Sequence, residues 1–373
     1  MNYQKYLPAR NCFYRPLSIH LRYYFNYILI LALAMMVMMA GCSKGPKAIT
    51  ILSPSGLIKT SVYTDSLRRL MYSIQYNNKI IVAPSPLGIN IDQQYPGEGV
   101  EIGVPVFSYL DEKYRWKGVH EVAHNRYREA IIPITCRHRG IRYQLEIKAF
   151  DDGIAFRYVV PKKGLSIVEG EASSWKIPQG STVWYQENIF DYEGLYHAIP
   201  LSGLGSKKIG PPLTYQTTDS VYVSVTEAAL YNYSGMSLQS DSSGMLRASF
   251  VNDPNGWEIR DTIVTPWRVA MVSPDLNGLV NADIIENLNP SPDSSLQNAD
   301  WIKPGKAVWS YFMHGNVTTM ALEKKYIDKA SRLGFEYNMV DAGWETSWPH
   351  PMKSLQALAA YACLLYTSDA ADE

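Results

Sequence analysis

The stretch YQLEIKAFDDGIAFRYVV, residues 143–160, indicates the fold class of this chain. Apolar and polar residues alternate along its first half, which in a β-strand puts one row of side chains in a core and the other row outside. The pair Asp152-Gly153 follows and predicts a tight hairpin with positive φ values at the turn. We therefore expect two antiparallel strands of a half-buried sheet.

The same pattern extends on both sides of this hairpin. Short alternating runs broken by Gly, Pro, Asn and Asp continue from about residue 49 to residue 285, with almost no helical periodicity. Further strands are expected over residues 57–63, 70–76, 79–83, 221–227 and 246–251. So many strands predict a large antiparallel sandwich, which we place at residues 46–296.

The pattern changes after a segment rich in Asn, Pro, Ser and Asp, residues 287–305, which is expected to be a linker. A strand is then predicted over 307–312, a helix over 319–333 that ends at Gly334, a strand over 336–340 and a helix over 355–362. Glu323, Lys324 and Lys325 are assigned to the solvent side of the first helix. This β-α-β-α order predicts parallel strands, as at the start of a (β/α)8 barrel or of a doubly wound sheet.

The balance of charged residues indicates which classes of binding partner are favoured. Lys and Arg together number 35, and so do Asp and Glu. No long-range field therefore favours nucleic acid or a polyanionic substrate, and a neutral partner fits better.

Residues 1–42 have the layout of a secretory signal peptide. A basic start precedes the uncharged run 27–39, and small residues stand directly before Cys42 in Met39-Ala40-Gly41-Cys42. This end resembles a lipobox, so we expect Cys42 to carry a lipid that anchors a bacterial protein in the periplasm or at the outer membrane. An ordinary cleaved signal peptide is the alternative.

Residues 363–373 fit neither the helix predicted before them nor a following barrel strand. We expect them to be an artefactual tail on a truncated sequence, because two barrel strands cannot close and would leave an apolar sheet edge exposed. The alternative is a naturally short protein with an acidic tail.

Five strings, in their order and spacing, resemble glycoside hydrolase family 97. They are FDDGIAFRY (150–158), VTEAAL (225–230), TPWRV (265–269), WSYF (309–312) and EYNMVDAGW (336–344). The resemblance implies an N-terminal antiparallel β-super-sandwich, a (β/α)8 catalytic barrel and a small C-terminal β domain. Residues 297–362 would then be the first β/α units of the barrel.

The resemblance also implies a calcium ion at the sugar-binding subsite, to which the sandwich donates a glutamate. Glu193, in DYEGLY (191–196), is the first candidate for this metal ligand and Glu187 is the second. Carboxylate oxygens suit Ca²⁺, although without the resemblance both residues would be read as surface acids. Arg268 is expected to clamp the sandwich to the barrel.

Three residues after the linker are candidates for contact with an oligosaccharide substrate. Asp341 ends the second predicted strand, and strand C-termini form the active-site floor of a (β/α)8 barrel. Trp344 and Trp309 offer apolar ring contact to sugar faces. The alternatives are a helix N-cap or salt bridge for Asp341 and barrel packing for the two tryptophans.

Glycoside hydrolysis requires two carboxyl groups, one of which protonates the leaving oxygen. The resemblance places both on later barrel strands, so catalytic residues are expected beyond residue 362 and this chain is expected to be inactive. The implied function is calcium-dependent hydrolysis of α-linked glucosides or galactosides. Two alternatives remain, a non-catalytic carbohydrate-binding envelope lipoprotein and a structural envelope protein without a sugar site.

Overall fold

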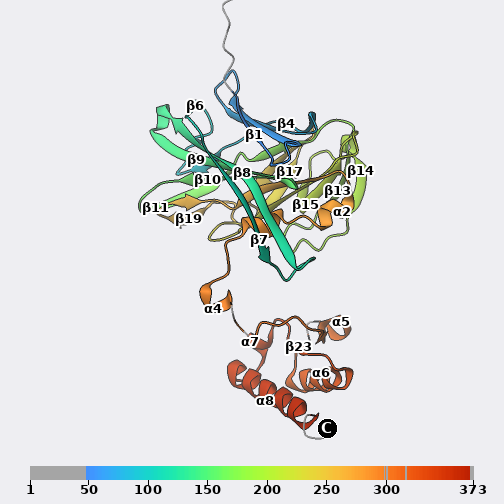
Figure 1. Cartoon of the computed structure of the whole chain (residues 1–373). Helices are drawn as coiled ribbons and strands as arrows, with labels where there is room; N and C mark the ends of the chain where they lie inside the picture. Colours follow the sequence, from blue (N-terminus) through green and yellow to red (C-terminus); the bar gives the residue numbers. More distant parts are fainter. Residues whose placement is uncertain (1–47, 298, 300, 316, 370–373) are drawn as a thin grey trace, which may run out of the picture. The chain divides into compact units, whose positions relative to one another are not determined.

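The computed structural model describes residues 48–297, 299, 301–315 and 317–369 (Figure 1). The predicted signal peptide with Cys42 lies outside the described residues. The chain divides into two compact units, one ending at Pro290 and the other beginning at Ser291. We call them the β-rich unit and the β-α-β unit. The sequence-based boundary, between residues 296 and 297, lies a few residues further along the chain.

The β-rich unit consists of short and medium-length strands followed by two short helices. The strands are β1 (Ile49–Leu52), β2 (Ile58–Thr64), β3 (Leu70–Tyr76), β4 (Lys79–Pro86), β5 (Ile89–Ile91), β6 (Val100–Ile102), β7 (Val106–Arg115), β8 (Val122–Cys136), β9 (Ile141–Phe150), β10 (Gly153–Val160), β11 (Leu165–Glu171), β12 (Ser174–Lys176), β13 (Thr182–Gln186), β14 (His197–Pro200), β15 (Lys208–Gln216), β16 (Tyr222–Ala228), β17 (Ser237–Ser240), β18 (Met245–Ser249), β19 (Trp257–Arg260), β20 (Ile263–Val264) and β21 (Trp267–Ser273). The helices are α2 (Leu276–Val280) and α3 (Ile284–Leu288).

These strands form a large curled antiparallel sheet of 18 strands and a smaller sheet of β19, β11 and β5. β7 and β8 pair along the whole of β7 and form the long hairpin seen in Figure 1. The antiparallel class predicted for this half of the chain is confirmed. The local alternation of apolar and polar residues was sufficient to predict this class, because antiparallel strands commonly have one face in the core and one face in solvent.

The hairpin predicted from residues 143–160 is present as β9 and β10, with Ala149 opposite Ile154. The predicted turn geometry is wrong, because neither Asp152 nor Gly153 has a positive φ. The Asp152 carboxylate instead accepts hydrogen bonds from the backbone N–H groups of Asp283, at 2.8 Å, and Ile284, at 3.1 Å. The turn is therefore shaped by a contact with the start of α3, far along the chain.

The two faces of this sheet bury two different apolar clusters. The inward row of β10, which includes Phe156 and Tyr158, belongs to the main core. The opposite row contributes Ala155 to a second cluster with Phe150 and Trp267. Residues of α3 cover that second cluster, so this helix completes the packing of the outer face of the sheet.

The β-α-β unit contains two parallel strands and several helices. Its elements are α4 (Ser294–Gln297), β22 (Ala307–Trp309), α5 (Tyr311–His314), α6 (Met320–Leu333), β23 (Tyr337–Met339), α7 (Trp344–Ser347) and α8 (Pro351–Asp369). β22 pairs with β23 in parallel, with Trp309 opposite Met339. α6 joins them and ends at Gly334, whose φ of 63° confirms the predicted helix C-terminus. Among the described helices, none is long and apolar enough to cross a membrane.

Three sequence predictions for this unit need correction. The strand expected over 307–312 ends at Trp309, because Tyr311 begins the short helix α5. The helix expected over 355–362 starts at Pro351, a favourable first residue, and continues through residues 363–369 without a break at the expected tail. Glu323, which was assigned to the solvent side of its helix, is fully buried.

Candidate functional site

The segment 187–196, which connects β13 to β14, carries both candidate calcium ligands. Its conformation is held by its own side chains: Asn188 Oδ1 accepts from the backbone of Phe190 at 3.3 Å, and Asp191 Oδ1 accepts from that of Glu193 at 3.1 Å. Gly194 lies so close to the buried Gln186 that a Cβ atom would stand 2.4 Å from its amide oxygen. The loop is therefore a defined turn, and a side chain at position 194 would displace the side chain of Gln186.

The two glutamates of this loop differ in availability. Lys207 Nζ lies 2.7 Å from Glu187 Oε1 and pairs with it. Glu193 is exposed, and its carboxylate makes no hydrogen bond or ion pair with any described residue. Of the two, Glu193 is the carboxylate free to bind an additional cation.

The loop does not by itself hold a metal ion. Ca²⁺ takes roughly 6–8 oxygen ligands. No group of three or more His, Cys, Asp or Glu side chains within the described residues could hold a metal. This part of the chain can therefore supply one carboxylate to a calcium ion, but it does not supply a complete ligand set.

Asp341 and Trp309 lie at the same edge of the parallel pair, because both follow or end a strand at its carboxyl end. Asp341 Oδ1 accepts a hydrogen bond from the next backbone N–H, Ala342, at 2.8 Å. Among the described residues, Asp341 is neither a helix N-cap nor a salt-bridge partner. α7 has Gly343 at its N-cap position, and Asp341 forms no salt bridge.

The two tryptophans have different surroundings. The Trp309 ring stacks on Tyr311 with centroids 5.1 Å apart, and Phe312 packs against its edge at 4.6 Å. Trp344 lies against Trp348 at 6.1 Å and joins the apolar cluster under α6 and α8. Trp344 therefore has a packing role in this unit, whereas Trp309 belongs to an aromatic group whose Phe312 is 79% exposed.

Arg268 is a residue whose role the sequence misjudged. It is fully buried within the β-rich unit, where Nε and one terminal nitrogen donate to the two carboxylate oxygens of Glu171 at 3.0 and 2.6 Å. A second terminal nitrogen donates to Glu227. Burial alone would lower the pKa of the guanidinium, but Glu171 and Glu227 raise that pKa well above its ordinary value.

The clamp between two domains that we expected of Arg268 is thus wrong, because all these partners lie inside one unit. The sequence contains a feature that indicates the burial of Arg268. Arg268 shares the apolar inward row of its strand with Ala270 and Val272, and a charge at such a position predicts a buried ion pair. Its partners stand 97 and 41 residues away, which alternation cannot reveal.

Glu323 is the second buried charge that the sequence missed. Ser310 Oγ donates to one of its oxygens at 2.8 Å, and Asn338 Nδ2 donates to the other at 2.9 Å. Glu323 therefore ties α6 to the end of β22 and to β23. Helical periodicity alone could not identify it, because this face of α6 is covered by strands rather than by solvent.

Comparison with known families identifies the domain to which the β-rich unit is similar. The model of the N-terminal domain of glycosyl-hydrolase 97 matches residues 51–291, which is nearly the whole β-rich unit. The matched span includes the loop 187–196 and the Arg268 ion cluster.

Two of the similar curated proteins are galactosidases by description. A retaining alpha-galactosidase of Bacteroides thetaiotaomicron is 28% identical over 347 residues, covering 80% of this chain and 50% of that protein. A protein of Streptomyces bingchenggensis, described as a probable retaining alpha-galactosidase, is 28% identical over 293 residues, covering 74% of this chain and 43% of its own length. The chain thus spans about half the length of the curated relatives it matches.

Solved structures are also similar to this chain. A Glycoside Hydrolase Family 97 enzyme from Pseudoalteromonas sp. strain K8, solved with panose and with acarbose, is 27% identical with a TM-score of 0.71 and covers 80% of this chain and 48% of its own. A beta-arabinopyranosidase shares the fold, with a TM-score of 0.73 at 22% identity.

Proposed function

Because the chain belongs to glycoside hydrolase family 97, we propose that it is the N-terminal part of an α-glycosidase that cleaves α-linked galactosides or glucosides. The observation that carries the proposal is the family match over residues 51–291. The names of the relatives, two retaining alpha-galactosidases, favour galactosides, whereas panose and acarbose in the Pseudoalteromonas enzyme favour glucosides.

The β-α-β unit is proposed to be the first part of a (β/α)8 barrel. Two parallel strands joined by α6 are the repeating element of that fold. The curled antiparallel sheet before it would be the β-super-sandwich of the family. The acid and the second carboxylate needed for hydrolysis would then come from strands beyond residue 362.

Within this scheme Asp341 and Trp309 have positions suited to hold a sugar. Both lie at the carboxyl end of the parallel strands, where a barrel binds its substrate. The Asp341 carboxylate retains acceptor capacity for sugar hydroxyl groups, since its one described hydrogen bond is to a neighbouring backbone N–H. Trp344 would support this edge from beneath through its contact with Trp348.

We further propose that the protein binds calcium and that Glu193 is the ligand from the β-rich unit. The exposed and unpaired state of its carboxylate supports this choice over Glu187, which Lys207 neutralises. When bound, the ion would supply positive charge that orients sugar hydroxyls and stabilises developing negative charge. We also propose that a lipid on Cys42 anchors the protein in the periplasm or at the outer membrane.

Hydrolysis of nitrophenyl α-galactoside and α-glucoside tests the function. The 373-residue chain is expected to release no nitrophenol, while a chain extended by its downstream reading frame is expected to hydrolyse at least one substrate. Hydrolysis of neither substrate by the extended chain would refute the function. Hydrolysis by the 373-residue chain itself would refute the placement of the catalytic carboxylates.

Calorimetry with CaCl₂ on the extended chain tests the metal assignment. Replacement of Glu193 by Gln is expected to weaken calcium binding at least about tenfold, since one charged ligand is lost. Glu187→Gln is the matched control and should leave the affinity nearly unchanged. Equal affinities of the Glu193→Gln variant and the parent chain would refute the assignment.

A further inference from the structure

The β-rich unit contains a basic pocket of about 710 Å³ with an aromatic floor. Strands β9, β10, β19, β20 and β21 form it together with residues 287–290 at the end of the unit. Three cations, Lys148, Arg157 and Arg260, line it, but only one carboxylate, that of Glu258, does so. Pockets that hold small organic ligands have volumes of roughly 300–1,000 Å³, so this one is large enough for a sugar.

Two of the cations lie over the ring of Trp267, which is buried at the floor. The Arg157 guanidinium carbon is 4.4 Å from the ring centroid, and Lys148 Nζ is 5.2 Å from it. Lys148 Nζ also lies 4.3 Å from the ring centroid of Tyr127. These aromatic faces attract the ammonium, but they do not neutralise its charge.

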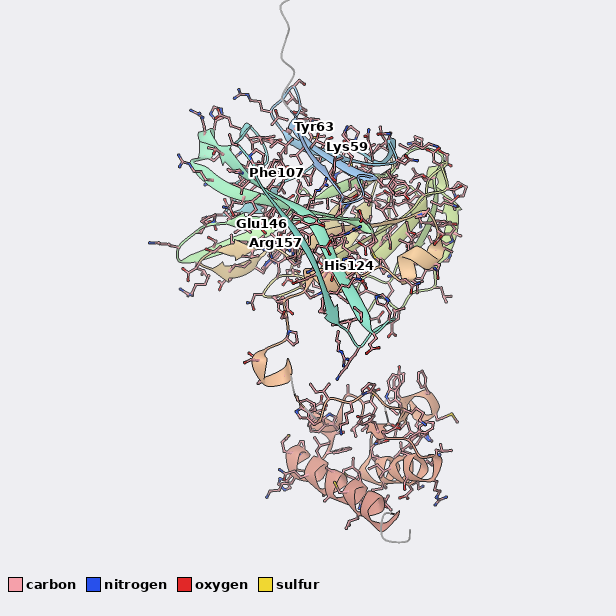
Figure 2. The ribbon with its side chains drawn as sticks, in the orientation of Figure 1. Lys59, Tyr63, Phe107, His124, Glu146 and Arg157 are labelled. Carbon is pink, nitrogen blue, oxygen red and sulfur yellow. The ribbon has the colours of Figure 1, made fainter. Side chains whose placement is uncertain are left out.

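Arg157 is neutralised within the wall of the pocket. Its Nε donates to Glu146 Oε2 at 2.6 Å, and Glu146 is only 8% exposed. Figure 2 shows these two side chains together, on the adjacent strands β9 and β10. The Arg157 guanidinium therefore already has its counter-charge.

Lys148 has no such partner. Within the described residues no carboxylate oxygen lies within 4.0 Å of its ammonium, and no hydrogen-bond acceptor is found for it. Glu129 stands opposite on β8, but its carboxylate accepts from Ser108 Oγ at 2.9 Å. Burial lowers the pKa of the Lys148 ammonium, and the nearby Glu129 carboxylate only partly opposes this effect.

We propose that this pocket binds a small molecule carrying a carboxylate, with the Lys148 ammonium as its principal partner, and that a sugar acid of the hexuronate type is the preferred source of that group. The exposed ring of Tyr231 and the amide of Asn232, at the pocket wall, offer stacking and hydrogen bonds to a sugar ring. Arg260 adds a second positive charge to the lining. The inference does not depend on the proposed hydrolysis, because every lining residue belongs to the β-rich unit.

Calorimetry with the full chain at pH 7 tests the proposal with three probes: sodium glucuronate, sodium propionate and glucose. Glucuronate is expected to bind saturably, propionate more weakly, and glucose not at all. Lys148→Met should weaken glucuronate binding at least about tenfold, because a charge-assisted hydrogen bond is lost. Lys113→Met, at an exposed lysine of β7 outside the pocket, is the matched control and should leave binding unchanged.

A labelling experiment on the unaltered chain covers the case in which Lys148→Met fails to fold. Glucuronate is expected to slow the acetylation of Lys148 by acetic anhydride, read by mass spectrometry, and to leave Lys113 unaffected. Glucuronate binding that persists in Lys148→Met, or acetylation of Lys148 that glucuronate does not slow, would overturn the proposal. Equal binding of propionate and glucuronate would support the carboxylate site and refute the contribution of the sugar ring.

Discussion

The β-rich unit and the β-α-β unit each bury a charged side chain, but they compensate it differently. In the first, Arg268 faces two carboxylates, those of Glu171 and Glu227. In the second, Glu323 is held by a hydroxyl and an amide group and meets no cation among the described residues. The charge of Arg268 is therefore balanced by opposite charges within its own unit, whereas the charge of Glu323 is held only by neutral hydrogen-bond donors.

The apolar cores show the same contrast. The main core of the β-rich unit draws on strands from β1 to β21. The β-α-β unit has a smaller apolar cluster, centred on Ile327, Trp348 and Leu358, while Phe312 and Met313 are 79% and 76% exposed. The β-rich unit therefore has the larger buried core, and we expect it to be the more stable of the two units.

The largest expected effect is that of Arg268→Met on the stability of the β-rich unit. The substitution leaves the buried carboxylate of Glu171 without its cation, and breaking such a pair costs about 3–5 kcal/mol. Urea unfolding followed by far-UV circular dichroism measures the loss.

Arg247→Met is the matched control for that experiment. Arg247 also pairs with a carboxylate, that of Asp241, but the two side chains are 48% and 34% exposed. Solvent screens this pair, so its loss should cost less than about 1 kcal/mol. Equal losses in the two variants would contradict the role assigned to the buried Arg268 ion cluster.

The next effect concerns pH and the Asp152 carboxyl group. Burial raises the pKa of this group to about 6, although the hydrogen bonds from Asp283 and Ile284 act in the opposite direction. A carboxyl pKa that is higher in the folded than in the unfolded state gives stability at low pH that is lost as the pH rises through the folded pKa. Between pH 4 and pH 7 this group should therefore cost the β-rich unit about 2 kcal/mol.

Asp152→Asn removes this titration while keeping an acceptor for α3. We expect the variant to gain stability relative to the parent chain as the pH rises from 4 to 7, measured by urea unfolding at each pH. A constant difference between the two proteins over that range would show that the Asp152 carboxylate is not held in an unfavourable environment.

The smallest expected effect is that of Glu323→Gln in the β-α-β unit. A glutamine can still accept from Ser310, and its amide can donate to Asn338 Oδ1, which has no hydrogen-bond partner in the described structure. The change should therefore cost less than about 1 kcal/mol. Hydrogen exchange of the α6 amides measures it, and Glu171→Gln, opposite a guanidinium, should be clearly more damaging to its own unit. Comparable losses would remove the contrast between the two buried charges.

The sequence was informative wherever a local period decides the structure. Alternation predicted β3 with its observed bounds, and helical spacing with Gly334 predicted α6 to its last residue. Sequence-based prediction failed where a contact with a distant part of the chain decides the local structure. The turn at Asp152 is set by α3, and the short helix α5 interrupts a run of aromatic residues that reads as a strand.

The candidate site was less accessible to sequence reasoning. Glu193 and Asp341 came from a family resemblance and from strand ends. Arg268, Glu323 and Lys148 acquire their roles from partners on other strands, which no local pattern identifies. A charge within an apolar row could have marked Arg268 as buried, but not its partners.

Hydrogen exchange on the full chain compares the two units most directly. If the β-rich unit is the more stable of the two units, amides of β9, β10 and β16 should exchange at least about a hundredfold more slowly than those of β22, β23 and α6, after correction for intrinsic rates. Equal protection of the two sets would mean that the β-α-β unit is as stable as the β-rich unit, and would contradict this account.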